Sequence, residues 1–74
     1  MKTPTKKQHE VVEYYTRFIE RNGGSAPTIA ECADGLGISL QLCYSRVRAL
    51  LQKGYLVNTL PGKNRGIKPT GKEG

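Results

Sequence analysis

The chain has little that would support metal chemistry or a membrane span. Its two cysteines, Cys32 and Cys43, and its one histidine, His9, stand at spacings that match no zinc finger. No apolar run approaches the length of about 20 residues that crosses a bilayer, and no signal-peptide core follows Met1. We therefore expect a cytoplasmic protein without metal, cofactor, small-molecule ligand or membrane contact, in which both cysteines stay free thiols.

Acidic residues are also scarce. Six Asp and Glu stand against twelve Lys and Arg, so the formal charge is +6 and the isoelectric point is near 9.6. A small domain with this excess of positive charge is expected to bind a polyanion, most often nucleic acid. The alternative is a basic surface that serves only solubility. The length allows one domain over residues 1–74, with an ordered core of about 5–69 and a flexible tail at 70–74.

The first helix is predicted to start near Lys6. Thr5 and Gln8 have the spacing of a capping box, and Asn22-Gly23-Gly24 ends the helix. Tyr14 is expected half-buried at the edge of the apolar stripe. That stripe has helical spacing and consists of Val11, Val12, Tyr15, Phe18 and Ile19.

The middle of the chain carries the strongest pattern. Thr28 and Glu31 form a second capping box, and Gly37 has the backbone freedom for a tight turn. Ser39 is a suitable N-cap for a longer helix that ends at Gly54. A short helix, a glycine turn and a longer helix are typical of a helix-turn-helix. The residues predicted to point inward are Cys32, Ala33, Leu36, Ile38, Cys43, Val47, Leu50 and Leu51.

A β-hairpin is predicted after the third helix. Tyr55–Asn58 and Arg65–Lys68 have strand-forming residues, and Pro61–Asn64 forms the turn between them. Pro69 limits the second strand because proline cannot donate to a ladder. The fold class is therefore mainly α with a small β-hairpin, a three-helix winged helix-turn-helix.

The outer face of the third helix is the candidate contact surface. An α-helix fits the major groove of DNA, which predicts base contacts from Gln41, Leu42, Tyr44 and Ser45. Gln41 suits an adenine and Leu42 a thymine methyl group, whereas Arg48 is expected on a phosphate. Two alternatives stay open: a solvated face at Gln41 and Ser45, and a protein-docking patch that includes Leu42 and Tyr44.

Candidate phosphate contacts lie at the hairpin tip and at helix N-termini. Lys63 and Arg65 give the predicted wing a basic tip, with Lys68 behind it; the alternative is a solubilising turn. Thr5 and Ser39 open helices whose first N–H groups suit an anion. With about 4–6 phosphate contacts, the binding constant should fall with salt at a log–log slope of about −4 to −5.

Three runs of residues share the spacing of a known family. They are Thr5-x-x-Gln8-x-Glu10-Val11, then Gly24-x-x-Pro27-Thr28-x-x-Glu31-x-Ala33-x-x-Leu36-Gly37, and finally Arg65-Gly66-Ile67, with Ser39, Ala49-Leu50 and Lys53-Gly54 between them. Together they resemble the N-terminal DNA-binding domain of the LexA repressor family over nearly the whole chain.

The resemblance implies a winged helix that binds duplex DNA, with its third helix in the major groove and its hairpin on the flanking backbone. It places Lys7, Ser39 and Lys53 at positions resembling phosphate contacts, and the four predicted base contacts on the helix surface that faces the bases. The full set expected on the DNA backbone is Lys7, Thr28, Ser39, Arg48, Lys53, Lys63 and Arg65.

The sequence also departs from the family. These 74 residues hold no counterpart of its self-cleaving protease domain, which supplies the serine–lysine autolysis, the DNA-damage switch and the main dimer contact. Leu40, Leu42 and Tyr44 stand where the family has small and acidic residues, and the turn before the third helix is one residue shorter. We therefore do not expect the family's operator sequence to carry over.

The predicted function is a sequence-specific transcriptional regulator, a repressor by resemblance, that is nucleoid-associated when bound to double-stranded DNA. One such module buries about 600–1,000 Å² on DNA, so we expect a homodimer on a two-fold site or a partner protein. The alternative is an adaptor that grips a protein through Leu40, Leu42 and Tyr44. Catalysis by Cys43 or Ser45 with His9 is not expected, because Cys43 faces inward and nothing places His9 near Ser45.

Overall fold

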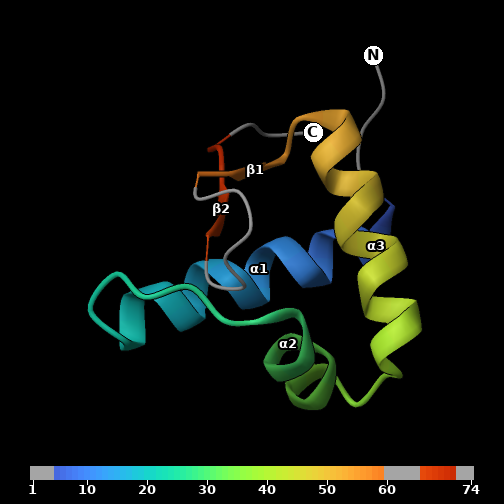
Figure 1. Cartoon of the computed structure of the whole chain (residues 1–74), viewed down its shortest axis with the longest axis horizontal. Coiled ribbons are helices and arrows are strands. Elements are labelled where there is room, and N and C mark those ends of the chain that lie inside the picture. Colours follow the sequence, from blue (N-terminus) through green and yellow to red (C-terminus); the bar gives the residue numbers. More distant parts are fainter. Residues whose placement is uncertain (1–4, 60–65, 72–74) are drawn as a thin grey trace.

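The computed structural model describes residues 5–59 and 66–71. Over these residues the order of elements is α1 (Lys6–Arg21), α2 (Ile29–Leu36), α3 (Leu40–Lys53), β1 (Leu56–Asn58) and β2 (Ile67–Pro69) (Figure 1). The predicted winged helix-turn-helix fold is thereby confirmed. The predicted turn at 61–64, the cations Lys63 and Arg65, and residues 72–74 of the predicted tail lie outside the described residues.

The first two helices begin at the capping boxes that the sequence predicts. Thr5 Oγ1 accepts a hydrogen bond from the Gln8 N–H at 3.1 Å, and Gln8 Oε1 accepts one from the Thr5 N–H at 3.2 Å. Thr28 and Glu31 exchange the same pair of bonds at 3.1 and 2.9 Å. These bonds satisfy backbone donors that have no partner within the helix, which fixes where each helix starts.

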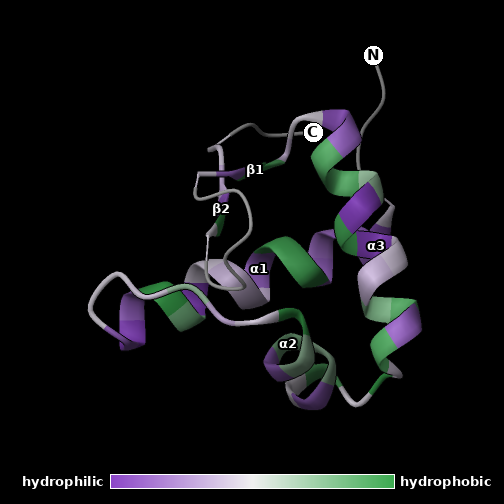
Figure 2. Ribbon diagram, viewed as in Figure 1, coloured by the Kyte–Doolittle hydropathy of each residue, from purple (hydrophilic) through white to green (hydrophobic). Residues whose placement is uncertain are grey.

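The core lies where the three helices and the hairpin meet. β1 packs against α3 and β2 against α1, so the hairpin covers the core from one side (Figure 1). Figure 2 shows hydrophobic segments alternating with hydrophilic ones along α1 and α3, as expected of amphipathic helices. Leu36, Ile38 and Leu51 pack at the core's margin. The buried residues of this core cluster are Val11, Tyr15, Cys32, Ala33, Cys43, Val47, Leu50, Tyr55, Leu56 and Ile67.

The hairpin differs from its prediction at both strand ends. Tyr55 precedes β1 and is buried in the core, while Pro69 is the last residue of β2. Pro69 pairs with Leu56, and the ladder bond beyond that pair runs from the Thr70 N–H to the Tyr55 carbonyl oxygen at 3.1 Å. Because hydrogen-bonded and non-hydrogen-bonded pairs alternate in an antiparallel ladder, Pro69 stands where no N–H is required.

Gly35 provides the space in which Tyr14 of α1 lies over α2. A Cβ atom at Gly35 would overlap the Tyr14 ring. The ring is held there by a hydrogen bond that its hydroxyl donates to the Glu31 carbonyl oxygen at 3.3 Å, and it packs 6.1 Å from the Phe18 ring. Tyr14 is thus half-buried, as predicted. Its position depends on the absence of a Cβ atom at Gly35 in α2.

Three polar groups share the centre of the core. Cys32 and Cys43 are free thiols, as predicted, and hydrogen-bond to each other between α2 and α3. The Tyr15 hydroxyl is buried and has no hydrogen-bond partner among the described residues. Burial raises the pKa of Cys32, Cys43 and Tyr15, because each of these groups is harder to ionise away from water.

We expect Gly35→Ala to lower the free energy of unfolding by about 1 kcal/mol, because overpacking costs about 1–3 kcal/mol and alanine returns about 1 kcal/mol of helix propensity. In a Tyr14→Ala background the same substitution should be neutral or stabilising, since the ring is gone. Urea unfolding of the unsubstituted chain, the two single variants and the double variant measures this coupling. Additive effects of the two substitutions would contradict the assigned contact.

We expect the free energy of unfolding to fall as the pH rises above about 9. The thiol of Cys32 ionises near its ordinary pKa of 9.0 in the unfolded chain but stays protonated in the folded one, so the folded state binds more protons. The loss should reach about 1.4 kcal/mol per pH unit for each buried thiol, with no such dependence below about pH 8.

Urea unfolding at about pH 7 and about pH 10 checks this expectation. The variant Cys32→Ala should lose less stability over the interval than the unsubstituted chain. Equal losses in both chains would show that the buried thiol does not set the alkaline response.

Candidate nucleic-acid interface

A three-residue turn joins α2 to α3 and fixes the direction of α3. Gly37 has φ 70° and ψ 33°, a left-handed conformation that favours glycine. Its N–H donates to the carbonyl oxygens of Ala33 and Asp34, and the Ile38 N–H donates to that of Ala33 at 3.0 Å. Ser39 then caps α3, its Oγ accepting from the Leu42 N–H at 3.1 Å. The predicted glycine turn and serine cap are both confirmed.

The inner and outer faces of α3 are cleanly divided. Cys43, Val47 and Leu50 are buried against the core. The structure places all five residues predicted on the outer face in exposed positions: Gln41, Leu42, Tyr44, Ser45 and Arg48. Their exposure makes them available to a ligand, while their contact with bases or phosphates stays a prediction.

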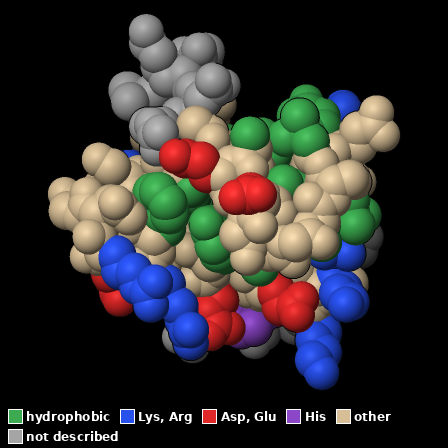
Figure 3. Space-filling model, turned by 90° about the horizontal axis from the view of Figure 1, so that it is seen from below, with side chains coloured by type: hydrophobic (Ala, Val, Ile, Leu, Met, Phe, Trp, Pro, Cys, Tyr) green, Lys and Arg blue, Asp and Glu red, His purple; other side chains and the backbone are tan. Residues whose placement is uncertain are grey.

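An apolar hollow lies between the start of α2 and the first turns of α3. It measures about 290 Å³ and is lined by Ile29, Leu40, Gln41 and Tyr44. Leu40 and Tyr44 remain 56% and 53% exposed there. Figure 3 views the molecule from the side of α2 and shows hydrophobic side chains interspersed with Asp and Glu side chains on this face, with most Lys and Arg side chains towards the edge of the view.

Leu42 does not belong to this hollow. At about 100° per residue, it lies about 160° around the helix from both Leu40 and Tyr44. Its side chain, 41% exposed, therefore projects from the opposite flank of α3. The three residues that were predicted as a single protein-docking anchor do not share one face.

The charges of α2 and α3 are of opposite sign. The α3 segment carries Arg46, Arg48 and Lys53 and no carboxylate, whereas α2 carries Glu31 and Asp34 and no cation. Glu31 is engaged in the cap of its own helix. The positive potential of the pair of helices therefore lies along α3, the helix with the exposed polar face.

Lys53 connects the end of α3 to the start of α1. Its Nζ donates a hydrogen bond to Gln8 Oε1 at 2.8 Å, and Lys7 is exposed beside Gln8 in sequence. Two of the predicted phosphate contacts, Lys7 and Lys53, are thus brought to one corner of the molecule. Of the others, Ser39 and Arg48 are exposed and Thr28 is partly buried at the N-cap of α2.

Arg46 is a cation of α3 that the sequence prediction left out. It is partly buried and lies seven positions before Lys53, so both side chains project from the same flank of the helix as Leu42. The i, i+7 spacing is the signal by which the sequence could have placed it beside the predicted set. Gln52 was also left out, although it is exposed on the outer face with Gln41, Ser45 and Arg48.

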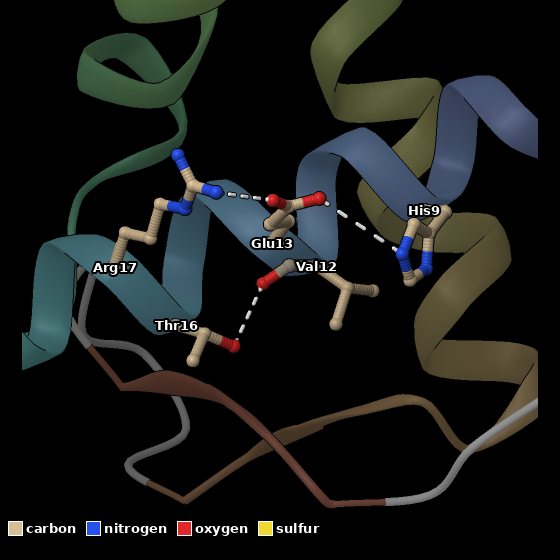
Figure 4. Close-up of polar contacts among 5 residues, drawn as sticks. All are labelled: His9, Val12, Glu13, Thr16 and Arg17. Atoms are coloured by element: carbon tan, nitrogen blue, oxygen red, sulfur yellow. Dashed lines mark hydrogen bonds and ion pairs between the residues drawn. The ribbon is translucent and has the colours of Figure 1, made fainter.

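The residues considered for catalysis lie in different surroundings. His9 lies on the exposed face of α1 with its Nε2 3.9 Å from Glu13 Oε2, and Arg17 pairs with the same carboxylate at 2.7 Å (Figure 4). Cys43 is buried against Cys32, and Ser45 is exposed on α3.

Residues 5–59 and 66–71 lack the features of two other classes of site. No group of three or more His, Cys, Asp or Glu side chains there is arranged to hold a metal ion. No helix there is both long and apolar enough to cross a membrane.

Residues 1–66 match the sequence profile of the LexA DNA binding domain. Similar curated proteins include LexA repressor 2 of Geobacter sulfurreducens, 39% identical over 72 residues, and the LexA repressors of Leptospira interrogans, 37% over 68, and Methylococcus capsulatus, 38% over 69. The alignments cover 96, 92 and 92% of this chain and 34, 32 and 33% of the relatives. The chain therefore spans about a third of their length.

The capping bond of Ser39 predicts how two substitutions will differ. Ser39→Ala should lower the free energy of unfolding by about 1 kcal/mol, since the Leu42 N–H loses its acceptor. Ser39→Asp should leave it unchanged or raise it, because a carboxylate caps equally well and favours the helix N-terminus. Thermal or urea unfolding distinguishes them, and equal destabilisation by both would argue against a capping role.

Proposed function

This chain belongs to the LexA DNA-binding domain family, and we infer that it represses transcription by binding a specific duplex site with α3 in the major groove. The observation that carries the proposal is the division of α3 into a buried apolar face and an exposed face with polar side chains and cations. An α-helix of this kind fits the major groove, where base edges present hydrogen-bonding groups and thymine methyl groups.

The outer face of α3 supplies the proposed base contacts. Gln41 and Ser45 project most directly away from the core, with Leu42 and Tyr44 on the two flanks. The Gln41 amide can form two hydrogen bonds with an adenine. Arg48 lies further along the helix, where a backbone phosphate comes within reach of its guanidinium group.

The proposed contacts with the DNA phosphates hold α3 in register with the bases. The start of α3, capped by Ser39, offers free N–H groups to a phosphate, and the start of α2 at Thr28 offers a second such end. Lys7 and Lys53, brought together where α1 begins and α3 ends, suit a phosphate at the other end of α3. Lys63 and Arg65 complete the proposed set from the wing, outside the described residues.

The assembly on DNA is part of the proposal. A single winged helix buries about 600–1,000 Å² on DNA, an area that rarely gives tight specific binding alone. Two copies on a two-fold site, or a partner protein, would supply the additional affinity. The domain itself acts by occupying its site, without catalysis, and would be nucleoid-associated in the cytoplasm when bound.

Selection of bound duplexes from a random-sequence pool at low salt tests sequence-specific binding directly. We expect one enriched motif, and its symmetry will report how many copies bind. A pool that yields no enriched motif would refute the proposal.

The affinity for the selected duplex should fall about tenfold in Arg48→Ala, which removes one charge-assisted contact. The slope of log Kd against log salt should also become shallower by about 1. The control is Arg17→Ala, which removes an exposed arginine that pairs with Glu13 on α1. Fluorescence anisotropy over a salt series measures both quantities, and equal losses in the two variants would show that Arg48 acts only through net charge.

A further inference from the structure

The apolar hollow between α2 and α3 adjoins the exposed polar face of α3. Its lining includes Ile29 at the first position of α2, Leu40 at the first position of α3, and Tyr44 one turn later. Leu40 and Tyr44 are each more than half exposed, so both leave apolar surface in water in the described chain. A ligand that covered this surface would recover the free energy of that exposure.

The hollow is continuous with the proposed base-contacting surface. Gln41 forms part of its wall, and Tyr44 belongs to both. It also lies at the start of α3, whose N-terminus is capped by Ser39 and favours an anion, whereas the start of α2 carries the Glu31 carboxylate in its own capping box. The charges near the hollow are mixed, with Glu31 and Asp34 on α2 and the cations of α3 beginning at Arg46. Because the hollow shares Gln41 and Tyr44 with the proposed base-contacting surface, its occupant is expected to come from the floor of the major groove.

We propose that this hollow receives the 5-methyl groups of thymine, so that the part of the site under the first turns of α3 is built of A·T pairs. The inference rests on the proposed DNA binding and deepens it. The thymine methyl is the apolar group that unmodified base pairs present in the major groove. Gln41, in the wall of the hollow, has the amide that pairs with the adenine of an A·T pair.

The distribution of cations in α3 supports the same base pairs. Residues 40–45 contain no arginine or lysine, and the first cation of the helix is Arg46. Guanine is most often recognised by arginine or lysine, so the start of α3 lacks the side chains that would favour a G·C pair. Apolar contact and the Gln41 amide are what this part of the helix offers.

Replacing thymine by uracil tests the proposal, because uracil lacks only the methyl group and keeps every hydrogen-bonding atom. In the duplex selected from the random pool, each thymine is replaced singly and Kd is measured by anisotropy. We expect one or two positions at which the replacement weakens binding about fourfold, the effect of one buried methyl group.

The variants Leu40→Ala and Tyr44→Ala connect that loss to the hollow. Both residues are exposed, so both variants should fold, which circular dichroism checks. In at least one of them the uracil penalty at the identified position should shrink to less than about 1.5-fold. The matched control is Val57→Ala, which shortens an exposed apolar side chain on β1 and should retain the full penalty.

Each other result overturns the inference in a distinguishable way. Specific binding without any uracil penalty would leave the proposed function intact and remove the methyl contact. A penalty that persists in both Leu40→Ala and Tyr44→Ala would place the methyl contact elsewhere or assign it to duplex shape. Self-association of the free chain that Leu40→Ala abolishes would assign the hollow to a second copy. Absence of DNA binding altogether would instead refute the proposed function.

Discussion

The contact between Cys32 and Cys43, together with the burial of Val47 and Leu50, fixes the rotation of α3 about its own axis, and this rotation sets the directions of the exposed side chains of that helix. Both residues are small and fully buried, so α2 and α3 meet without a large side chain between them. The left-handed turn at Gly37 brings α3 back over α2 in that register. A large residue at either cysteine position would turn the outer face of α3 away from its present direction.

The remaining elements hold this helix pair in place. α1 packs against both helices, β1 against α3 and β2 against α1, so the hairpin returns to the same core as the helices. The bond between Lys53 and Gln8 joins the last residue of α3 to the first turn of α1. The predicted phosphate contacts at that corner therefore rest on a helix end that is fixed by a tertiary contact.

Local patterns in the sequence predicted the local parts of the fold. Both capping boxes, the Ser39 cap and the glycine turn at Gly37 depend on residues within a few positions of each other, and all four were predicted correctly. Helical spacing likewise identified the buried face of α3. Tyr55 was assigned to a strand because its residue type favours one, but its burial before β1 depends on packing against distant residues.

Features that join separate helices were the ones that sequence patterns did not supply. Gly35 makes room for Tyr14 from a different helix, and the hollow arises only because Ile29 comes beside Leu40 and Tyr44. The separation of Leu42 from those two residues follows from the helical step alone and was available from the sequence. The sequence thus predicted which residues of the candidate site are exposed. It did not predict the hollow that those residues form with a neighbouring helix.

The division of α3 into two faces has a consequence for how this domain can diversify. The side chains of α3 that are buried in the core and those proposed to contact bases are different sets, while Thr28, Ser39 and Lys53 both stabilise the fold and belong to the proposed phosphate contacts. Substitutions at the outward positions leave the scaffold's folding free energy nearly untouched. Gene copies of such a domain are therefore free to acquire new target sequences by drift and selection at a few surface codons, without compensating changes inside.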